Sequence, residues 1–414
     1  MAVVYLSTVS RSPVGKGAVV GGNVLALGTV SLITDVSSEM ITAILPVYLV
    51  VGLHLSPLAF GVLDGVHTGA TAVLRLAGGF VADRVRARKL VAGFGYGLSA
   101  VMKLGLLVAG RSVGALGVVI AADRLGKGLR TAPRDALISL SVPPSQLGRA
   151  FGVHRMMDSA GAFLGPLVAL GVLFAAGGTS YDAVFVTSFC VAVFGVVVLV
   201  LFVREHQAVV PARSVKLAEA ARLLREPRVR RLLVAAGLLG LATIGDGFVY
   251  LLLQRGSDLS VRWFPLLAVG TSLAYLLLAA PLGRLADRVG RLRVVVGGYL
   301  ALAVIYLLLA GSGGGWVRLG VVLAGYGLFY AATDGVLMAL AGAIMPERVR
   351  TTGLALVQTG QALAYLVSSV LFGAAWQLWG PDVAIRAAAV LALVAVAGTV
   401  ALTRMGAQSG KADQ

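Results

Sequence analysis

Residues 282–293 read LGRLADRVGRLR, and residues 78–89 read GGFVADRVRARK. The two stretches share the sequence ADRV, which places Asp83 and Asp287 at matching positions. Each stretch follows a long apolar run and ends in a cluster of arginines. A repeat of this kind predicts two similar units, each with the basic stretch between its second and third apolar segments.

The composition predicts a chain that is surrounded by lipid. Hydrophobic residues make up 58% and charged residues 13%, whereas a soluble domain carries about 25% charged residues. Apolar runs that are long enough to cross a bilayer as helices recur throughout, and they lack the alternation of a membrane β-barrel. We expect an all-α membrane protein with twelve transmembrane helices, near residues 20–52, 57–82, 90–110, 113–139, 150–176, 182–203, 232–254, 263–284, 293–311, 316–344, 351–376 and 381–403.

The connections between these segments differ in charge. The even-numbered ones are basic, at 83–89, 204–231, 287–293 and 347–350, whereas the connections after the first and fifth segments contain no Lys or Arg. Because basic loops stay in the cytoplasm, we expect a multi-pass protein of the cytoplasmic (inner) membrane with both termini cytoplasmic. The same rule accounts for the net charge of +17, so no nucleic-acid partner is expected.

The longest polar segment, 204–231, divides the chain. We expect an N-terminal six-helix bundle at 1–203, a cytoplasmic linker at 204–231 and a C-terminal six-helix bundle at 232–414. Apolar residues in the linker recur at helical spacing, which is typical of an amphipathic helix at a membrane surface.

These features resemble the major facilitator superfamily of secondary transporters. The second basic stretch matches the family's loop motif at Gly283, Asp287, Arg288, Gly290, Arg291 and Arg293, and the first matches it at Gly79, Asp83, Arg84, Arg88 and Lys89. The first copy departs from the motif at Arg86, where the family usually has glycine. The resemblance covers essentially the whole chain and implies two pseudo-symmetric six-helix bundles.

Two further motifs resemble proton-coupled drug and metabolite antiporters. Residues 123–135, DRLGKGLRTAPRD, place Arg124, Lys127 and Arg130 where such proteins carry a motif in the fourth helix. Residues 161–166, GAFLGP, resemble the antiporter signature of the fifth helix, with Gly161, Gly165 and Pro166. Small residues at this spacing also occur wherever membrane helices pack closely, so a packing role stays open.

The resemblance also implies a conformational latch at the cytoplasmic side. Asp83 would dock at the start of the eleventh helix, just after Arg350, where a helix N-terminus favours a carboxylate. The latch residues are Gly79, Asp83, Arg84, Asp287, Arg288 and Arg350. Alternatively, the arginines serve only to keep these loops in the cytoplasm.

Charged residues within the apolar segments are the candidate site. Arg124, Lys127, Arg130 and Arg134 follow one another at helical spacing, and charges at membrane depth must face a polar interior. Acids and histidines of other segments are the candidate partners. We expect proton coupling or a central cavity to involve Asp35, Glu39, Asp64, His67, Arg124, Lys127, Arg130 and Asp158. A structural ion pair between Asp35 and a base of the fourth helix is the alternative.

The second half has fewer buried charges. Its substrate-cavity candidates are Asp246, Asp334, Gln358 and Gln361. We therefore expect proton handling in the first half and much of the substrate surface in the second.

The sequence predicts a secondary transporter that works by alternating access, most simply a drug or metabolite antiporter that exports a small organic solute against protons. The alternative is uptake of a small anionic metabolite through the basic face of the fourth helix; divalent metal transport and a non-transporting sensor are weaker alternatives. No enzyme and no cofactor are expected, because GKG at 126–128 lacks the spacing of a phosphate-binding loop and no metal-ligand cluster occurs. The expected partners are the lipid bilayer, protons and a small-molecule substrate, and we expect a monomer.

Overall fold

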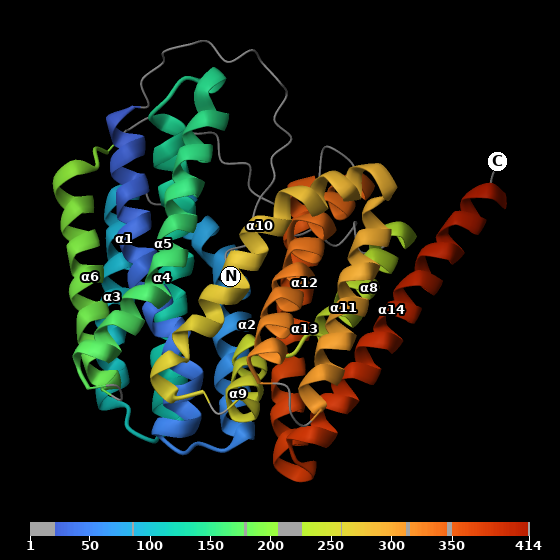
Figure 1. Ribbon diagram of the computed structural model, residues 1–414. Helices are drawn as coiled ribbons and strands as arrows, with labels where there is room; N and C mark the ends of the chain where they lie inside the picture. The colour runs from blue at the N-terminus through green and yellow to red at the C-terminus, as the bar shows by residue number, and fades with distance from the viewer. Residues whose placement is uncertain are drawn as a thin grey trace.

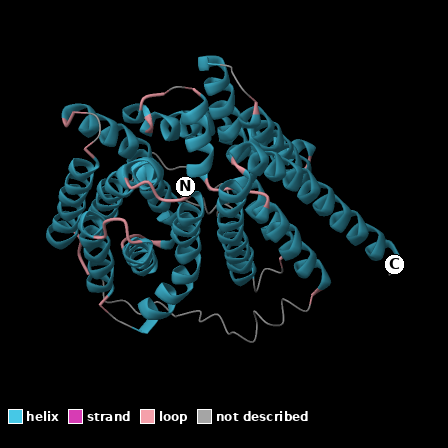
Figure 2. Ribbon diagram, turned by 90° about the horizontal axis from the view of Figure 1, so that it is seen from below, coloured by secondary structure: helices cyan, strands magenta, loops and turns pink. Residues whose placement is uncertain are grey.

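The computed structural model describes residues 21–84, 87–177, 180–205, 226–257, 259–311, 315–345 and 350–412, with side chains except at 71–84, 144, 350–352 and 403–412. Within these ranges the chain is helical and contains no strand (Figure 2). The helices are α1 (Gly22–Val47), α2 (Pro57–Arg84), α3 (Arg88–Val108), α4 (Val113–Leu140), α5 (Leu147–Ala175), α6 (Tyr181–Phe202), α8 (Pro227–Leu241), α9 (Asp246–Gly256), α10 (Pro265–Val289), α11 (Arg291–Ala310), α12 (Gly315–Ile344), α13 (Arg350–Trp379) and α14 (Pro381–Ala412). Three short turns of helix join them, η1 (Tyr48–Gly52), η2 (Pro144–Gln146) and η3 (Val261–Trp263).

Lipid offers no hydrogen bonds, so a chain this apolar satisfies its backbone within helices. Across the described ranges there are twelve segments, if α1 with η1, α8 with α9, and η3 with α10 each count as one. Ten segments of the described chain are long and apolar enough to cross a membrane. α4 is not among them, since it carries six charged residues, and its polar face must therefore be covered by other helices.

The segments form two groups, shown in blue to green and in yellow to red in Figure 1. In the first group α1 packs against α5 and α6, and α4 packs against α2 and α3. In the second group α8 packs against α13 and α14, and α12 packs against α10 and α11. The expected fold class, with twelve helices in two six-helix bundles, is confirmed.

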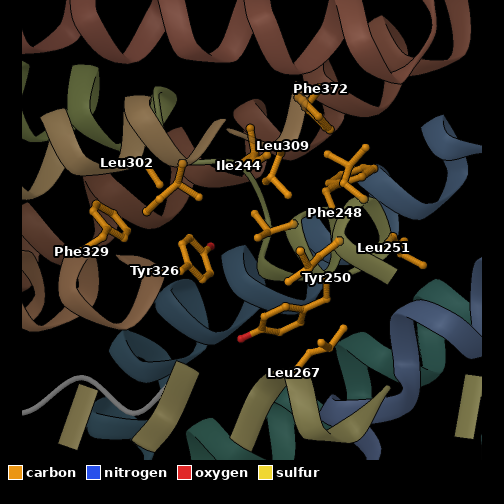
Figure 3. Packing of buried hydrophobic residues seen from close by; sticks show 14 of the residues in the cluster. Ile244, Phe248, Tyr250, Leu251, Leu267, Leu302, Leu309, Tyr326, Phe329 and Phe372 are labelled. Carbon is orange, nitrogen blue, oxygen red and sulfur yellow. The ribbon is translucent and has the colours of Figure 1, made fainter. Parts of the chain in front are cut away.

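The two bundles meet mainly through α2 with α13 and α5 with α10. At the end where α9 lies, which we call the α9 end, one hydrophobic cluster includes Phe60 of the first bundle and Phe248 and Phe372 of the second. Phe248 lies beside Phe372 (Figure 3), and its ring centroid is 4.7 Å from that of Phe60. At the other end, which carries the basic connections and which we call the basic end, the described bundles have separate hydrophobic clusters. The bundles are therefore joined at the α9 end.

The segment expected at 232–254 as one continuous span is broken in the structure. α8 ends at Leu241 and α9 begins at Asp246, and the residues between them, Ala242 to Gly245, include a threonine and a glycine, which favour helix weakly. The backbone N–H of Ile244 donates to the hydroxyl of Tyr306 at 3.0 Å, and that hydroxyl donates to the carbonyl of Ala242 at 3.3 Å. Tyr306 thus replaces hydrogen bonds that the break removes.

The second copy of the basic motif makes a tight connection. α10 ends at Val289, α11 begins at Arg291, and Gly290 between them has φ of 101°. Only glycine adopts this conformation without strain. The glycine of the motif is therefore required by the turn; Arg86, which replaces it in the first copy, lies outside the described residues.

Candidate functional site

The charged row of α4 meets acids on α1. The Arg130 Nη2 lies 3.2 Å from Oδ1 of Asp35, and the Lys127 Nζ lies 3.9 Å from Oε1 of Glu39. Asp35 and Arg130 are 6% and 2% exposed, whereas Lys127 and Glu39 are only half-buried. Two of the predicted bases are thus brought together with the two predicted acids of α1, at different depths in the protein.

A second group of charges lies next to this pair, around Asp158 of α5. Arg134 contacts Asp158 and Asp135 at 3.9 and 3.0 Å, and Arg155 contacts Asp158 at 3.6 Å. The hydroxyl of Ser31 on α1 donates a 2.7 Å hydrogen bond to Asp158. Asp158 therefore connects α1, α4 and α5.

The two groups lie beside each other. The carboxylates of Asp35 and Asp158 are within electrostatic range of each other. Adjacent carboxylates repel each other when both are ionised, and a proton on one of them removes this repulsion. We call Asp35, Asp158, Arg130 and Arg134 the acid–base cluster; its ion pairs join α1, α4 and α5.

The GAFLGP motif explains why α1 and α5 approach so closely. A Cβ added at Gly161 would collide with the backbone of Leu32, and one at Gly165 would lie 2.7 Å from the carbonyl oxygen of Val36 and from the Cβ of Glu39. Only glycine leaves room for this contact. The motif thus packs α5 against the face of α1 that carries Asp35 and Glu39.

Arg124 points away from the acid–base cluster. Its Nη2 lies 2.7 Å from Oδ2 of Asp123, and Lys103 of α3 lies 3.5 Å from the same carboxylate. Ser99 donates a 2.6 Å hydrogen bond to Asp123, and His67 is within electrostatic range of Arg124. Arg124 and His67 therefore belong to a separate buried charge group inside the first bundle.

A further group of polar side chains lies where the two bundles meet near the break of α8 and α9. Asp64 of α2 accepts a hydrogen bond from Ser369 of α13 and lies within electrostatic range of Asp246. The hydroxyl of Tyr365, on the same helix as Ser369, accepts the backbone N–H of Asp246 at 3.3 Å. Tyr326 and Tyr330 of α12 both donate to the carboxylate of Asp246, Tyr326 at 2.7 Å. Asp64 and Asp246, both predicted, thus lie together in a set of hydroxyl donors from the second bundle.

The remaining candidates of the second half are placed more loosely. Asp334 is half-buried and lies within electrostatic range of Tyr275, which in turn lies within range of Arg155. Gln358 and Gln361 are half-buried on α13, and the backbone of Gln361 packs against Gly240.

The latch is only partly described. The structure describes no side chains at Gly79, Asp83, Arg84 and Arg350, so the contact expected for Asp83 stays a prediction. Asp287 and Arg288 are exposed, and Asp287 lies 3.5 Å from Arg291 one turn later. In this conformation the described ion pair of the second motif copy thus joins two residues that are close in sequence.

The two described histidines of the first bundle's charge groups, His67 and His154, lie in different groups. His154 is buried within electrostatic range of Asp158, while His67 lies with Arg124. Among the described residues no group of three or more His, Cys, Asp or Glu is arranged to hold a metal ion.

Several residues of the site were not predicted. Tyr96 lies under Arg130, with the guanidinium carbon 4.5 Å from the ring centroid; Ser31, Tyr326 and Ser369 supply hydroxyl donors. Lys103 was also missed, although a lysine inside an apolar segment is itself a signal of a polar interior.

Comparison with known proteins decides the family. The sequence profile described as Major Facilitator Superfamily matches residues 27–270 and 248–413. The chain belongs to the major facilitator superfamily. An uncharacterized MFS-type transporter of Methanocaldococcus jannaschii is 30% identical over 387 residues, which cover 90% of this chain and 92% of that protein.

Solved structures agree in fold. A mutant of the nucleoside transporter NupG superposes with a TM-score of 0.81 at 14% identity, covering 92% of this chain and 99% of that chain. A bacterial homologue of the human lysosomal transporter Spinster, inward-facing and unoccupied, gives a TM-score of 0.68 at 17% identity, with 92% and 96% covered. The protein is therefore a multi-pass membrane transporter of the major facilitator type, and the predicted family is confirmed.

Proposed function

We propose that this transporter exports a small organic solute in exchange for protons and that the acid–base cluster carries the proton. The observation on which this rests is the 3.2 Å contact of Asp35 with Arg130, beside a second acid, Asp158, that pairs with Arg134. Three helices of the first bundle, α1, α4 and α5, supply the charges of the acid–base cluster. A change in its protonation therefore acts on the packing of all three.

The exchange follows from the charges of the cluster. With one proton bound to the pair, only one of Asp35 and Asp158 is an anion. Loss of the proton leaves two adjacent anions beside Arg130 and Arg134, and repulsion between them favours a different arrangement of α1 and α5. A solute that binds the deprotonated arrangement more tightly is thereby coupled to proton release.

We further propose that the basic end faces the cytoplasm and that the conformation is inward-open. The distribution of Lys and Arg among the connections supports the orientation, and the separate cores at the basic end support the opening. In this proposal the halves at 1–203 and 232–414 are joined by the linker at 204–231 and rock so that the basic end and the α9 end open in turn, in a monomer of the cytoplasmic membrane.

Uptake of an anionic metabolite is the second candidate. Lys127 supports it, because this base is half-buried and its distance to Glu39 is 3.9 Å, which leaves it able to bind an anion. Arg130 and Arg134 support it less, since both already contact acids. Charge reversal of Lys127 by Lys127→Glu separates the two: it abolishes transport if the solute is an anion bound there.

The test is transport by purified protein in proteoliposomes, with ligands first identified by thermal-shift screening of organic cations, anions and neutral solutes. An imposed pH gradient should drive solute accumulation in vesicles that contain the unmodified protein, and Asp35→Asn should abolish the response to the gradient. Asp135→Asn is the matched control, because Asp135 also contacts Arg134 but is the more exposed acid, so it should keep the response. Accumulation that ignores the gradient would contradict the proposal.

A further inference from the structure

A groove at the basic end of the second bundle has no part in the proposed transport site. It lies between α8, α11, α12 and α14 and has a volume of about 290 Å³, close to the lower end for pockets that bind small molecules, about 300–1,000 Å³. Leu239, Val295 and Leu337 form its buried floor, and Ile344 lies exposed at its rim. The lining is almost entirely aliphatic, which suits the apolar tail of a ligand.

Two arginines stand at the mouth of this groove. Arg228 lies in the first turn of α8 and Arg231 at the start of the second. Among the described residues, these two are the only charged ones that line the groove. Arg228 is exposed, and Arg231 is half-buried with its Nε donating to the carbonyl of Pro227 at 3.3 Å. Cations and a helix N-terminus at one end of an apolar groove favour a ligand with an anionic head and an apolar tail.

The first bundle also has a pocket at the basic end, of about 710 Å³, lined by residues at the ends of α1, α4 and α6 and by Arg204. There Val24, Leu27, Leu137, Ile138 and Val198 pack into a buried cluster, supplied by α1, α4 and α6. A pocket at this end is therefore common to both bundles, and the second one differs in its almost entirely aliphatic lining with two arginines at its mouth.

We propose that this groove binds an anionic phospholipid of the leaflet at the basic end, with the phosphate between Arg228 and Arg231 and an acyl chain along the floor. Charge complementarity and the position of the groove identify the occupant: it opens at the level of the basic connections, where basic pockets between membrane helices bind anionic headgroups. Burial of methylene groups in the groove adds affinity that a free phosphate ion does not gain.

Native mass spectrometry of the full-length protein in neutral detergent tests the proposal, with phosphatidylglycerol and phosphatidylcholine of identical acyl chains as probes. We expect phosphatidylglycerol to bind about ten- to thirtyfold more tightly. The double variant Arg228→Gln/Arg231→Gln should lose this preference. Arg230→Gln is the matched control, because Arg230 lies on the same turn, is exposed and does not line the groove, and it should keep the preference.

A second variant tests the apolar part independently of the charges. Leu340→Trp fills the groove and should weaken binding of both lipids, whereas Leu300→Trp, at an exposed position on α11, should leave both unchanged. Equal affinity of the unmodified protein for the two lipids would overturn the proposal, as would an equal loss in Arg230→Gln. Inorganic phosphate that competes as well as phosphatidylglycerol would also overturn it, since the groove would then contribute nothing.

Discussion

Arg130 of α4 reaches Asp35 of α1 across 95 residues of sequence, with Nη2 3.2 Å from Oδ1 and both side chains almost completely buried. The guanidinium also lies on the ring of Tyr96, so its charge is balanced by an acid on one helix and supported by an aromatic face on another. A pair this deeply buried is costly to break, because the remaining partner keeps its charge without solvent.

A mutant cycle on this pair should show strong coupling. We expect Arg130→Gln to destabilise the protein by about 3–5 kcal/mol, and the double variant Arg130→Gln/Asp35→Asn to be more stable than the sum of the single changes predicts. The measurement is unfolding in detergent. The same cycle on Lys127 and Glu39, which are 3.9 Å apart and more exposed, should show a coupling of about 0–1 kcal/mol. Additive effects in the first cycle would show that the buried contact carries no energy.

The contact between α1 and α5 should depend on Gly165. Gly165→Val forces a side chain against Val36 and Glu39 and should cost about 1–3 kcal/mol by overpacking. Gly171→Val introduces the same residue on the same helix, at a position where an added Cβ meets nothing within 4 Å. Thermal unfolding of the two variants compares them directly; equal stability would mean that the glycine of the motif is not needed for packing.

The break between α8 and α9 should depend on the hydroxyl of Tyr306. Tyr306→Phe leaves the buried N–H of Ile244 without its acceptor, at a cost of about 1–3 kcal/mol. Hydrogen exchange of the Ile244 amide should speed up in this variant, while Tyr275→Phe, which removes a half-buried hydroxyl from α10, should leave it unchanged. Unaltered exchange in Tyr306→Phe would assign the stability of the break to other contacts.

The α9 end should have to open during transport. The ring of Phe174 on α5 lies 4.8 Å from that of Trp263 beside α10, so cysteines at both positions are close enough for a short thiol cross-linker. In a background with Cys190→Ser, which removes the single cysteine of the chain, the cross-linked Phe174→Cys/Trp263→Cys protein should lose transport and regain it on reduction. Full transport by the cross-linked protein would contradict the opening of this end.

Helical spacing within α4 predicted that its charges face other helices, because the positions of charges along a single helix can be read from the sequence. It did not predict which base meets which acid. Arg124 and Arg130 are six residues apart, and at about 100° a residue their directions differ by about 120°. Arg124 consequently turns to Asp123 and Lys103, whereas Arg130 takes the position opposite Asp35.

The break of the seventh span and the partners of Asp246 were less predictable. The segment 242–245 is short and mostly apolar. Its hydropathy therefore does not distinguish a break from a continuous helix. Tyr326, Tyr330 and Tyr365 reach Asp246 only after α12 and α13 have packed near it. Such contacts depend on tertiary structure, which single-sequence patterns do not contain.

Proton release on ligand binding tests the central claim most directly. The purified protein is placed in weakly buffered detergent solution, a transported solute is added, and the change in pH is recorded. The account predicts that binding releases protons from the unmodified protein and from Asp135→Asn but not from Asp35→Asn. Binding of the solute without any release of protons would contradict it.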